Sequence, residues 1–590
     1  MRIKPVLLAS AALALAIPAL AQQQGAAPTP ANQYPGGGIG AQSIPQPAAS
    51  QGVPETEAGS TSDSADETAV ETVGQLNLAP VAPPVEYPGW SRRDPWNVGA
   101  LNPSDVGLTD DPWGSANGAF LSSLMRRMET PIASRWAHIA LRDALLAKAR
   151  APAEVNPVDW VAERTWLLLR LGEADGAQML VAGVDADRFT PKMVQVGVQT
   201  ALASADPPAL CPLEDGIRKY EPAIKALVQA MCASMGGDSQ SAFAQIDNAR
   251  RYGRIGGIDL SLAQKVVGAG GSGQAATIEW EPVDQLTSWR FGLAAGTGML
   301  PPLRLVNASS TQLRAFMARA PMLTAQQRLD SAFIAAGLGV FSSQTMVDLY
   351  SSIYDSTDPG DLADSDAWQL RQAFVGKDEE TRLAAIRKLL ALGKDPLRKE
   401  AARAAVARAA TLVTPDKKLA KDAPELIASM LAAGYDQAAA RWVPVIGQMD
   451  DEDADRCWAM LALASPNIAD VGTGRISAFI RRDKSQGQER SAFLVAGLAG
   501  LGRISSDTAN SLNRRYGLGL GRTTSWTKVI DAAAARGQPG TVLVLTGTGF
   551  QTASIDRLPS SHLYHSVAAL KHTGQDFIAR MIAAEALSRT

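Results

Sequence analysis

Apolar side chains recur at helical spacing from about residue 115 to the end of the chain. Two clear examples are PIASRWAHIALRDALLAKAR (131–150) and LRKEAARAAVARAATLV (397–413), where apolar residues stand three and four positions apart among good helix formers. The strict alternation typical of strands is scarce. Glycine and proline interrupt the runs at intervals of roughly 10 to 20 residues, as in short helices joined by tight turns. The pattern predicts an all-α fold.

A degenerate internal repeat predicts that these helices form hairpins. Four glycines are each followed, five positions later, by an alanine, and then by small or apolar residues four and seven positions further on. The sets are Gly172 with Ala177, Val181 and Val184; Gly237 with Ala242, Ile246 and Ala249; Gly434 with Ala439, Val443 and Ile446; and Gly574 with Ala579, Ala583 and Ala586. Glycine permits the turn at the end of the first helix. The small or apolar residues form one stripe on the second helix, which lets it pack closely against its neighbours.

The segment GGDSQSAFAQIDNARR (236–251) resembles the second half of the tetratricopeptide motif. The resemblance implies an α-solenoid, a superhelical stack of short antiparallel helix pairs. The chain departs from the motif where Ala226, Gln229 and Ala230 occupy the bulky and glycine positions of the first helix, and where Arg254 occupies the closing proline position. These departures leave the repeat family open.

The length of the helical part also favours stacked pairs. The roughly 480 residues that follow the N-terminal segments exceed the usual size of one compact core, whereas a solenoid needs each pair only to cover its neighbours. The glycine-rich stretch beginning at Val267 is the best internal break. We therefore predict helical-repeat regions over 115–268 and 286–590, separated by a loop over 269–285.

The first residues have the pattern of a secretory signal. Arg2 and Lys4 precede an apolar run over 6–17, and a small-residue cleavage site ends at Ala21. The run is shorter than the roughly 20 residues of a membrane-spanning helix, and the first cysteine, Cys211, is far from any lipid-attachment position. We expect cleavage after residue 21, no transmembrane segment in the mature chain, and a periplasmic or secreted location.

Two further segments separate the signal from the helices. Residues 22–88 are acidic and rich in Gln, Ala, Pro, Gly and Ser, so they cannot bury enough apolar surface to offset their ordering entropy, and we predict a disordered tether. Residues 89–114 contain Trp90, Trp96 and Trp113 among prolines and glycines. This strap either packs its indoles onto the first helices or serves as a short docking motif.

The net charge argues against nucleic acid as a partner. The formal net charge is −3, so there is no basic field to hold a phosphate backbone, and we do not expect nucleic acid as a partner.

The cysteines suggest one possible disulfide. Cys211 and Cys232 flank a helical segment and are candidates for a disulfide in an oxidising compartment, although free thiols remain the alternative. Cys457 lies in an apolar helical pattern and is expected in the core.

The stretch TVLVLTGTGFQ (541–551) has the look of a phosphate-binding loop but lacks its chemistry. Gly547 and Gly549 are not followed by the third glycine of a dinucleotide fingerprint or by the Gly-Lys-Ser/Thr of a phosphate loop. We predict that residues 542–545 form a short buried helix, with a buried strand as the alternative.

Two groups of residues could in principle bind metal ions, one of histidines and one of aspartates, but both are better explained as parts of ordinary helices. His562, His565 and His572 share one helical face, but the last two lie roughly 10.5 Å apart along the axis, too far to share an ion. We expect this face to be solvated.

Asp451, Asp453 and Asp455 have the spacing that opens a calcium-binding hand. Arg456 and Ala462, however, stand where that loop needs glycine and glutamate. Acidic residues ahead of an apolar run are explained by the dipole at a helix N-terminus.

No catalytic set emerges from the sequence. The Glu-Ser pair usual in lytic transglycosylases does not occur, and the 6% aromatic content and four histidines supply little for a polysaccharide lyase. We predict no catalytic, cofactor or metal residues, and a non-catalytic helical-repeat scaffold or adaptor that binds another cell-envelope protein or a cell-wall component. The alternatives are an all-α enzyme acting on envelope glycan, and a structural part of a surface assembly.

Overall fold

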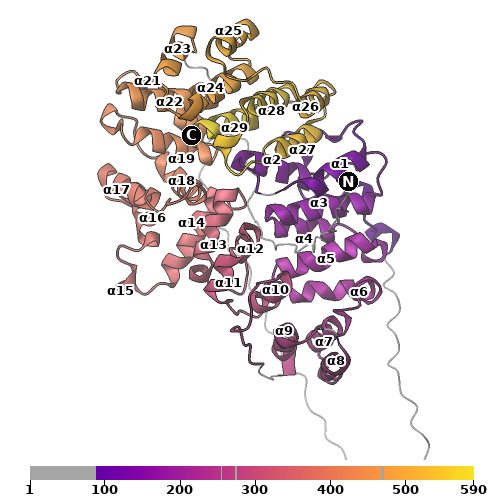
Figure 1. The fold of residues 1–590 in the computed structure, drawn as a ribbon. Helices are drawn as coiled ribbons and strands as arrows, with labels where there is room; N and C mark the ends of the chain where they lie inside the picture. The colour runs from indigo at the N-terminus through magenta and orange to yellow at the C-terminus, as the bar shows by residue number, and fades with distance from the viewer. Residues whose placement is uncertain (1–87, 130, 254, 273–275, 467–470) are drawn as a thin grey trace, which may run out of the picture. The chain divides into compact units, whose positions relative to one another are not determined.

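The computed structural model describes residues 88–590, except 130, 254, 273–275 and 467–470 (Figure 1). The predicted signal peptide over 1–21, and the predicted tether over 22–88 except its last residue, lie outside the described residues. The described residues form α-helices joined by turns and contain no β-strand, which confirms the all-α prediction. None of the described helices has the length and apolar character that crossing a bilayer demands.

The α-helices follow one another with short connections. In chain order they are α1 (Gly118–Arg127), α2 (Arg135–Leu146), α3 (Pro157–Leu171), α4 (Ala174–Ala182), α5 (Pro191–Ala203), α6 (Glu214–Tyr220), α7 (Lys225–Met235), α8 (Ser239–Tyr252), α9 (Gly257–Val267), α10 (Ser288–Gly296), α11 (Leu303–Ala308), α12 (Thr311–Met317), α13 (Ala325–Leu338), α14 (Ser343–Ser356), α15 (Pro359–Leu362), α16 (Asp366–Val375), α17 (Glu379–Leu390), α18 (Pro396–Ala410), α19 (Ala423–Ala432), α20 (Asp436–Ala440), α21 (Val443–Ile446), α22 (Asp451–Ala464), α23 (Thr473–Arg482), α24 (Glu489–Gly500), α25 (Ser506–Tyr516), α26 (Ser525–Ala535), α27 (Pro539–Gly549), α28 (Ser560–His572) and α29 (Asp576–Ser588).

The four repeat glycines make the same turn between paired helices. Gly172, Gly237, Gly434 and Gly574 have φ values of +97°, +89°, +80° and +87°, in the left-handed region that favours glycine. In each turn the next residue donates its amide to a carbonyl five positions back, as Gln575 does to Leu570 over 2.8 Å, which is the Schellman pattern. The alanines five positions after the glycines are all 0% exposed. Helical turns are thus confirmed at these four places. The predicted stripe is interrupted after Gly434, where the second element is broken into α20 and α21, and Val184 lies beyond the end of α4.

Helix α27 contains the glycine-rich stretch that resembled a phosphate loop. Residues 542–545 are helical and buried, as predicted, and Pro539 begins the helix. Its glycines allow close packing: a side chain at Gly549 would collide with the ring of Trp526, and a Cβ at Gly547 would stand 2.9 Å from Leu141 Cδ2. The Gly-Thr-Gly sequence therefore serves contacts between helices.

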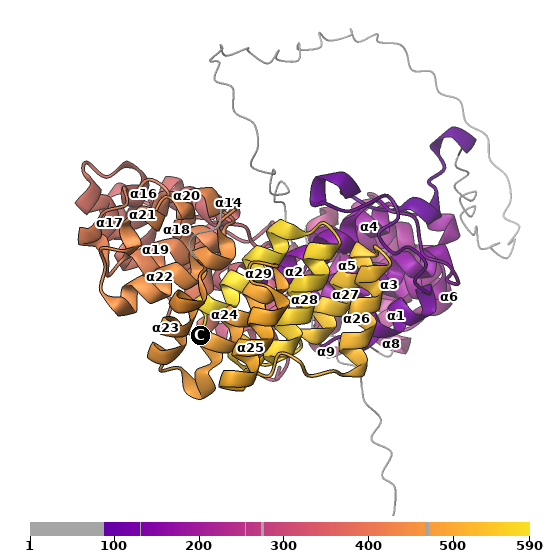
Figure 2. The same cartoon turned by 90° about the horizontal axis from the view of Figure 1, so that it is seen from above.

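Helices from both ends of the region 93–590 pack together. Helix α2 lies against α27 and α29 as well as against its sequence neighbour α3 (Figures 1 and 2). The carboxylate of Glu585 on α29 accepts hydrogen bonds from Ser134 Oγ at 2.5 Å and from the amides of Arg135 and Trp136 at 2.8 and 3.1 Å. One glutamate near the end of the chain thus caps the N-terminus of α2.

Arg135 extends this junction to the middle of the chain. Its buried guanidinium donates to the carbonyl oxygens of Ala336 at 2.8 Å, Phe341 at 3.1 Å and Ala432 at 2.5 Å. Ala336 and Ala432 lie in the last turns of α13 and α19, where helix dipoles favour a cation. Burial lowers the pKa of Arg135 to about 10, partly offset by Glu585, so the group stays charged at neutral pH.

The predicted break over 269–285 falls between helices that pack on each other. Helix α10, after this segment, contacts α5 and α9, which precede it. Together with α6, α7 and α8 they enclose a small apolar cluster around Leu202, Met231 and Leu293. Residues 93–590 accordingly form one compact unit.

We expect Glu585→Ala to destabilise the protein by roughly 3 kcal/mol or more, because it leaves three buried donors without an acceptor and removes the carboxylate next to Arg135 and Arg589. Urea unfolding followed by circular dichroism measures this loss. Glu281→Ala, at an exposed site, serves as the control and should change stability by no more than about 0.5 kcal/mol. Equal stability of the two variants would contradict the role given to Glu585.

Candidate functional site

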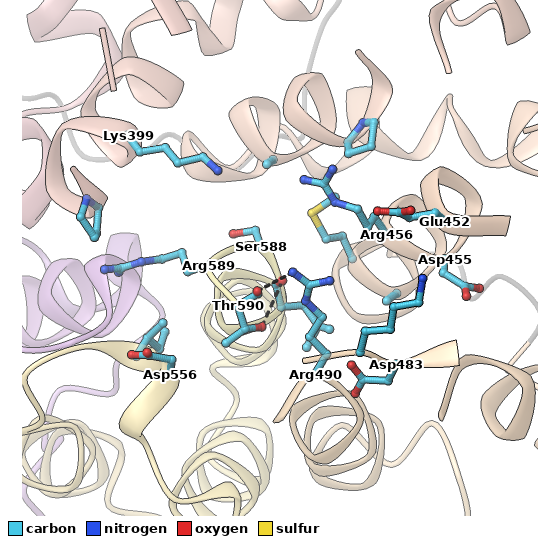
Figure 3. Close-up of a pocket in the computed structure, with 18 of the residues that line it drawn as sticks. Lys399, Glu452, Asp455, Arg456, Asp483, Arg490, Asp556, Ser588, Arg589 and Thr590 are labelled. Carbon is cyan, nitrogen blue, oxygen red and sulfur yellow. Dashed lines mark hydrogen bonds between the residues drawn. The ribbon is translucent and has the colours of Figure 1, made fainter. Parts of the chain in front are cut away.

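A cleft with a volume of about 900 Å³ opens among α18, α22, α23 and the end of α29. We call it the charged cleft, because most side chains around it are ionic (Figure 3). Its charged lining residues are Lys394, Asp395, Lys399, Glu400, Arg403, Asp451, Glu452, Asp455, Arg456, Arg481, Arg482, Asp483, Lys484, Arg490, Asp556 and Arg589.

An ionic network stabilises one wall of the charged cleft. The buried Arg403 donates to Glu400 at 2.6 Å and, through two nitrogens, to Glu425 at 2.9 and 3.1 Å. Lys399 and Arg456 each approach the same Glu425 to 3.3 Å. Burial acts to raise the pKa of Glu425, but the charges of Arg403 and Lys399 outweigh it and lower the pKa. This carboxylate therefore holds three cations in place at neutral pH.

A second network joins α22 to α23 at the charged cleft. Asp455 on α22 accepts two hydrogen bonds from Arg482 on α23, both at 2.7 Å, and a third from Arg475. The hydrogen bonds from Arg482 and Arg475 outweigh the effect of burial and lower the pKa of Asp455. Arg475 also lies over the Trp458 ring, with its guanidinium carbon 4.4 Å from the centroid. The pairing of α22 with α23 thus depends largely on this carboxylate.

Charges of both signs lie close together around the charged cleft. Figure 3 shows Lys399, Arg589 and Asp556 toward one end, Arg456, Glu452 and Asp455 toward the other, and Arg490 between them. Arg490 donates to the backbone oxygen of Thr590 at 2.5 Å, which holds its side chain over the end of α29. A ligand in this cleft would meet cations and carboxylates at both ends.

Three exposed cations at the charged cleft, Lys394, Arg481 and Lys484, have no ion-pair partner among the described residues. Their charges are available to a ligand. The lining residues that the structure describes include no histidine, cysteine or tyrosine. The chemistry offered by this set is ionic recognition through guanidinium, ammonium and carboxylate groups.

The candidate disulfide residues are adjacent. Cys211 and Cys232 are joined as a disulfide with their Cα atoms 5.6 Å apart, and the bond connects the segment before α6 to α7. Cys457 is buried, as expected, and burial raises the pKa of its thiol to about 12. Both features lie outside the lining of the charged cleft.

The three strap tryptophans differ in exposure. Trp113 is 0% exposed and packs edge-on against Trp160 on α3, with ring centroids 5.1 Å apart. It therefore belongs to the core, in keeping with the packing alternative. Trp96 is 44% exposed and Trp90 is 89% exposed, so their indoles remain accessible.

The histidines are less solvated than predicted. His562 Nδ1 lies 2.9 Å from the carbonyl oxygen of Gly549, and His565 Nδ1 lies 2.8 Å from Asp531 on α26. Both rings are half-buried because α28 packs against α26 and α27, and only His572 is exposed. The expectation of a solvated face is wrong for the first two.

The aspartates that mimic a calcium loop begin a helix. Asp450 caps the N-terminus of α22, and Asp451 and Asp453 lie in its first turn, as the dipole interpretation predicted. No group of three or more potential metal ligands occurs within the described ranges.

Sequence reasoning did not identify the charged cleft. Its residues come from six separated stretches, 393–403, 424–428, 451–460, 479–490, 554–556 and 587–590. The dense ionic runs DDEDADR and RRDK, which supply many of its charged residues, are visible in the sequence. Nothing in either run indicates that they face one another.

No protein-family model, no curated protein and no solved structure matches the chain.

We expect Glu425→Gln to cost roughly 2 kcal/mol at pH 7, and the cost to shrink as the pH falls. Because the folded-state pKa of Glu425 is lowered, its contribution is complete above the unfolded value near 4.5 and is lost as the pH falls through the folded value. Urea unfolding of both proteins at pH 7, 4 and 3 tests this. A difference that stays constant over that range would contradict the assignment.

We expect the purified chain to contain one disulfide and one free thiol. Alkylation followed by mass spectrometry should label only Cys457, and only after unfolding, because that thiol is buried. Cys211→Ala with Cys232→Ala should lower the free energy of unfolding by about 3 kcal/mol, the value for closing a loop of this length. Labelling of all three cysteines under non-reducing, unfolding conditions would show that the pair is not oxidised.

Proposed function

We propose that the chain is an exported helical-repeat adaptor that binds a segment of another cell-envelope protein in the charged cleft. The observation that carries the proposal is a cleft lined by closely mixed cationic and anionic side chains, whose walls are fixed by ionic networks (Figure 3). A polypeptide segment with interspersed acidic and basic residues complements such a surface along its length.

The fixed geometry favours a specific partner. Glu425 orders Lys399, Arg403 and Arg456 before any ligand arrives, so binding costs little further side-chain entropy on that wall. Guanidinium groups bind carboxylates in defined orientations, which adds selectivity for acidic side chains. The unpaired Arg481 and Lys484 supply charge that the folded chain itself does not neutralise.

The location and the repeat architecture are further parts of the proposal. The secretory pattern at residues 1–21 supports export. The composition of residues 22–88 supports the predicted tether as a flexible connection to the helical part of the chain. Four hairpins with the same Schellman turn support a tetratricopeptide-like stack, a class of architecture suited to binding extended segments.

We expect Arg481→Glu with Lys484→Glu to abolish recovery of the partner in crosslinking and co-purification of the full chain from cells. Both side chains are exposed and unpaired, so the substitutions should leave folding intact. The matched control is Arg522→Glu with Lys528→Glu, which makes the same change in net charge at exposed positions outside the charged cleft and should retain the partner.

Equal recovery by both variants would contradict binding in the charged cleft. Loss of the partner only when residues 22–87 are deleted would assign recognition to the tether. That deletion spares Trp113 and the other strap residues that pack in the core. Release of soluble fragments from envelope glycan by the purified protein would instead support the enzyme alternative.

A further inference from the structure

A second cavity, of about 700 Å³, lies where α5 approaches α12 and the segment before α10. We call it the acidic pocket. None of its described lining residues is a lysine, arginine or histidine, in contrast to the charged cleft. It contains two tryptophans and three carboxylates, so its chemistry differs from that of the site already described.

Two indole rings line the acidic pocket. Trp166 on α3 and Trp289 on α10 are both half-buried, which leaves part of each ring open to the cavity. The indole N–H of Trp289 donates to the backbone oxygen of Asp259 at 3.0 Å, and this bond fixes the ring. Exposed aromatic faces of this kind attract cations and the apolar stems that carry them.

The carboxylates give the acidic pocket a net negative charge. Asp259 is neutralised by Arg290, whose two nitrogens each lie 2.9 Å from its oxygens. Glu221 and Asp284 have no ion-pair partner among the described residues. Two negative charges therefore face a cavity that offers no internal cation.

Gln199, on α5, also lines the acidic pocket, but its side-chain oxygen is buried and closed to solvent. A ligand therefore meets mainly the carboxylates and the indole faces. Both select a cation that carries an apolar stem.

We propose that the acidic pocket binds an alkylammonium or guanidinium group. The cation would pair with Glu221 and Asp284 and lay its apolar stem against Trp166 and Trp289. An anion would find no cationic side chain here, and a neutral sugar would leave both carboxylates uncompensated. The group can come from a lysine or arginine side chain of a basic peptide or from a free diamine.

This site goes beyond the proposed function, because it lies on other helices and takes a different ligand. The variant Arg481→Glu with Lys484→Glu should therefore leave cation binding in the acidic pocket unchanged. Loss of partner recovery without loss of cation binding, or the reverse, separates the two proposals.

Isothermal titration calorimetry of the full chain with 1,5-diaminopentane and with the peptide Lys-Ala-Lys tests the inference. Binding of either cation supports it, and the preferred probe identifies the source. Glu221→Gln with Asp284→Asn should weaken binding roughly tenfold, since each exposed pair contributes under about 1 kcal/mol. The control Glu129→Gln with Asp355→Asn, at exposed carboxylates elsewhere, should bind like the natural protein.

The indoles provide a second readout. Trp166→Leu should weaken binding, and Trp166→Phe should restore part of it, because an aromatic face is retained. Circular dichroism confirms that each variant is folded. Failure of both cations to bind at millimolar concentration, equal binding by the carboxylate variant and its control, or tighter binding of a neutral trisaccharide would overturn the proposal.

Discussion

The buried contact between Glu585 and the start of α2 is the constraint on which the rest of the structure depends. The carboxylate satisfies the hydroxyl of Ser134 and the first amides of α2, while Arg135 satisfies carbonyl oxygens of two helices from the middle of the chain. These groups are buried, so water cannot replace a hydrogen-bond partner that is lost. Three distant parts of the sequence are therefore held in one arrangement.

Local patterns in the sequence predicted the local structure well. The spacing of apolar residues indicated helices. Gly172, Gly237, Gly434 and Gly574 marked the turns between helices, because this turn needs a residue with positive φ and glycine adopts it most easily. The failure of the motif around Gly547 correctly indicated a buried helix instead of a nucleotide site. In each case, residues close together in the sequence contained the necessary physical information.

The sites could not be predicted in the same way, because they depend on distant contacts. The charged cleft requires Arg403, Asp455, Arg490 and Arg589 to meet, and no spacing rule links positions so far apart. His562 and His565 were misjudged for the same reason, since the covering side chains Trp526 and Asp531 belong to another helix. A single sequence indicates that a helix face is polar, but it does not indicate which neighbour covers that face.

The cap on α2 has a consequence for synthesis of the chain. Residue 585 must leave the ribosome before the amides of residues 135 and 136 find their acceptor, so more than 400 residues are made while this junction is open. Such long-range closure slows folding, because the entropy of closing a long loop is lost before the contact forms. The hairpins depend on local contacts and can form first, so the junction between α2 and α29 is the step that joins them into one unit.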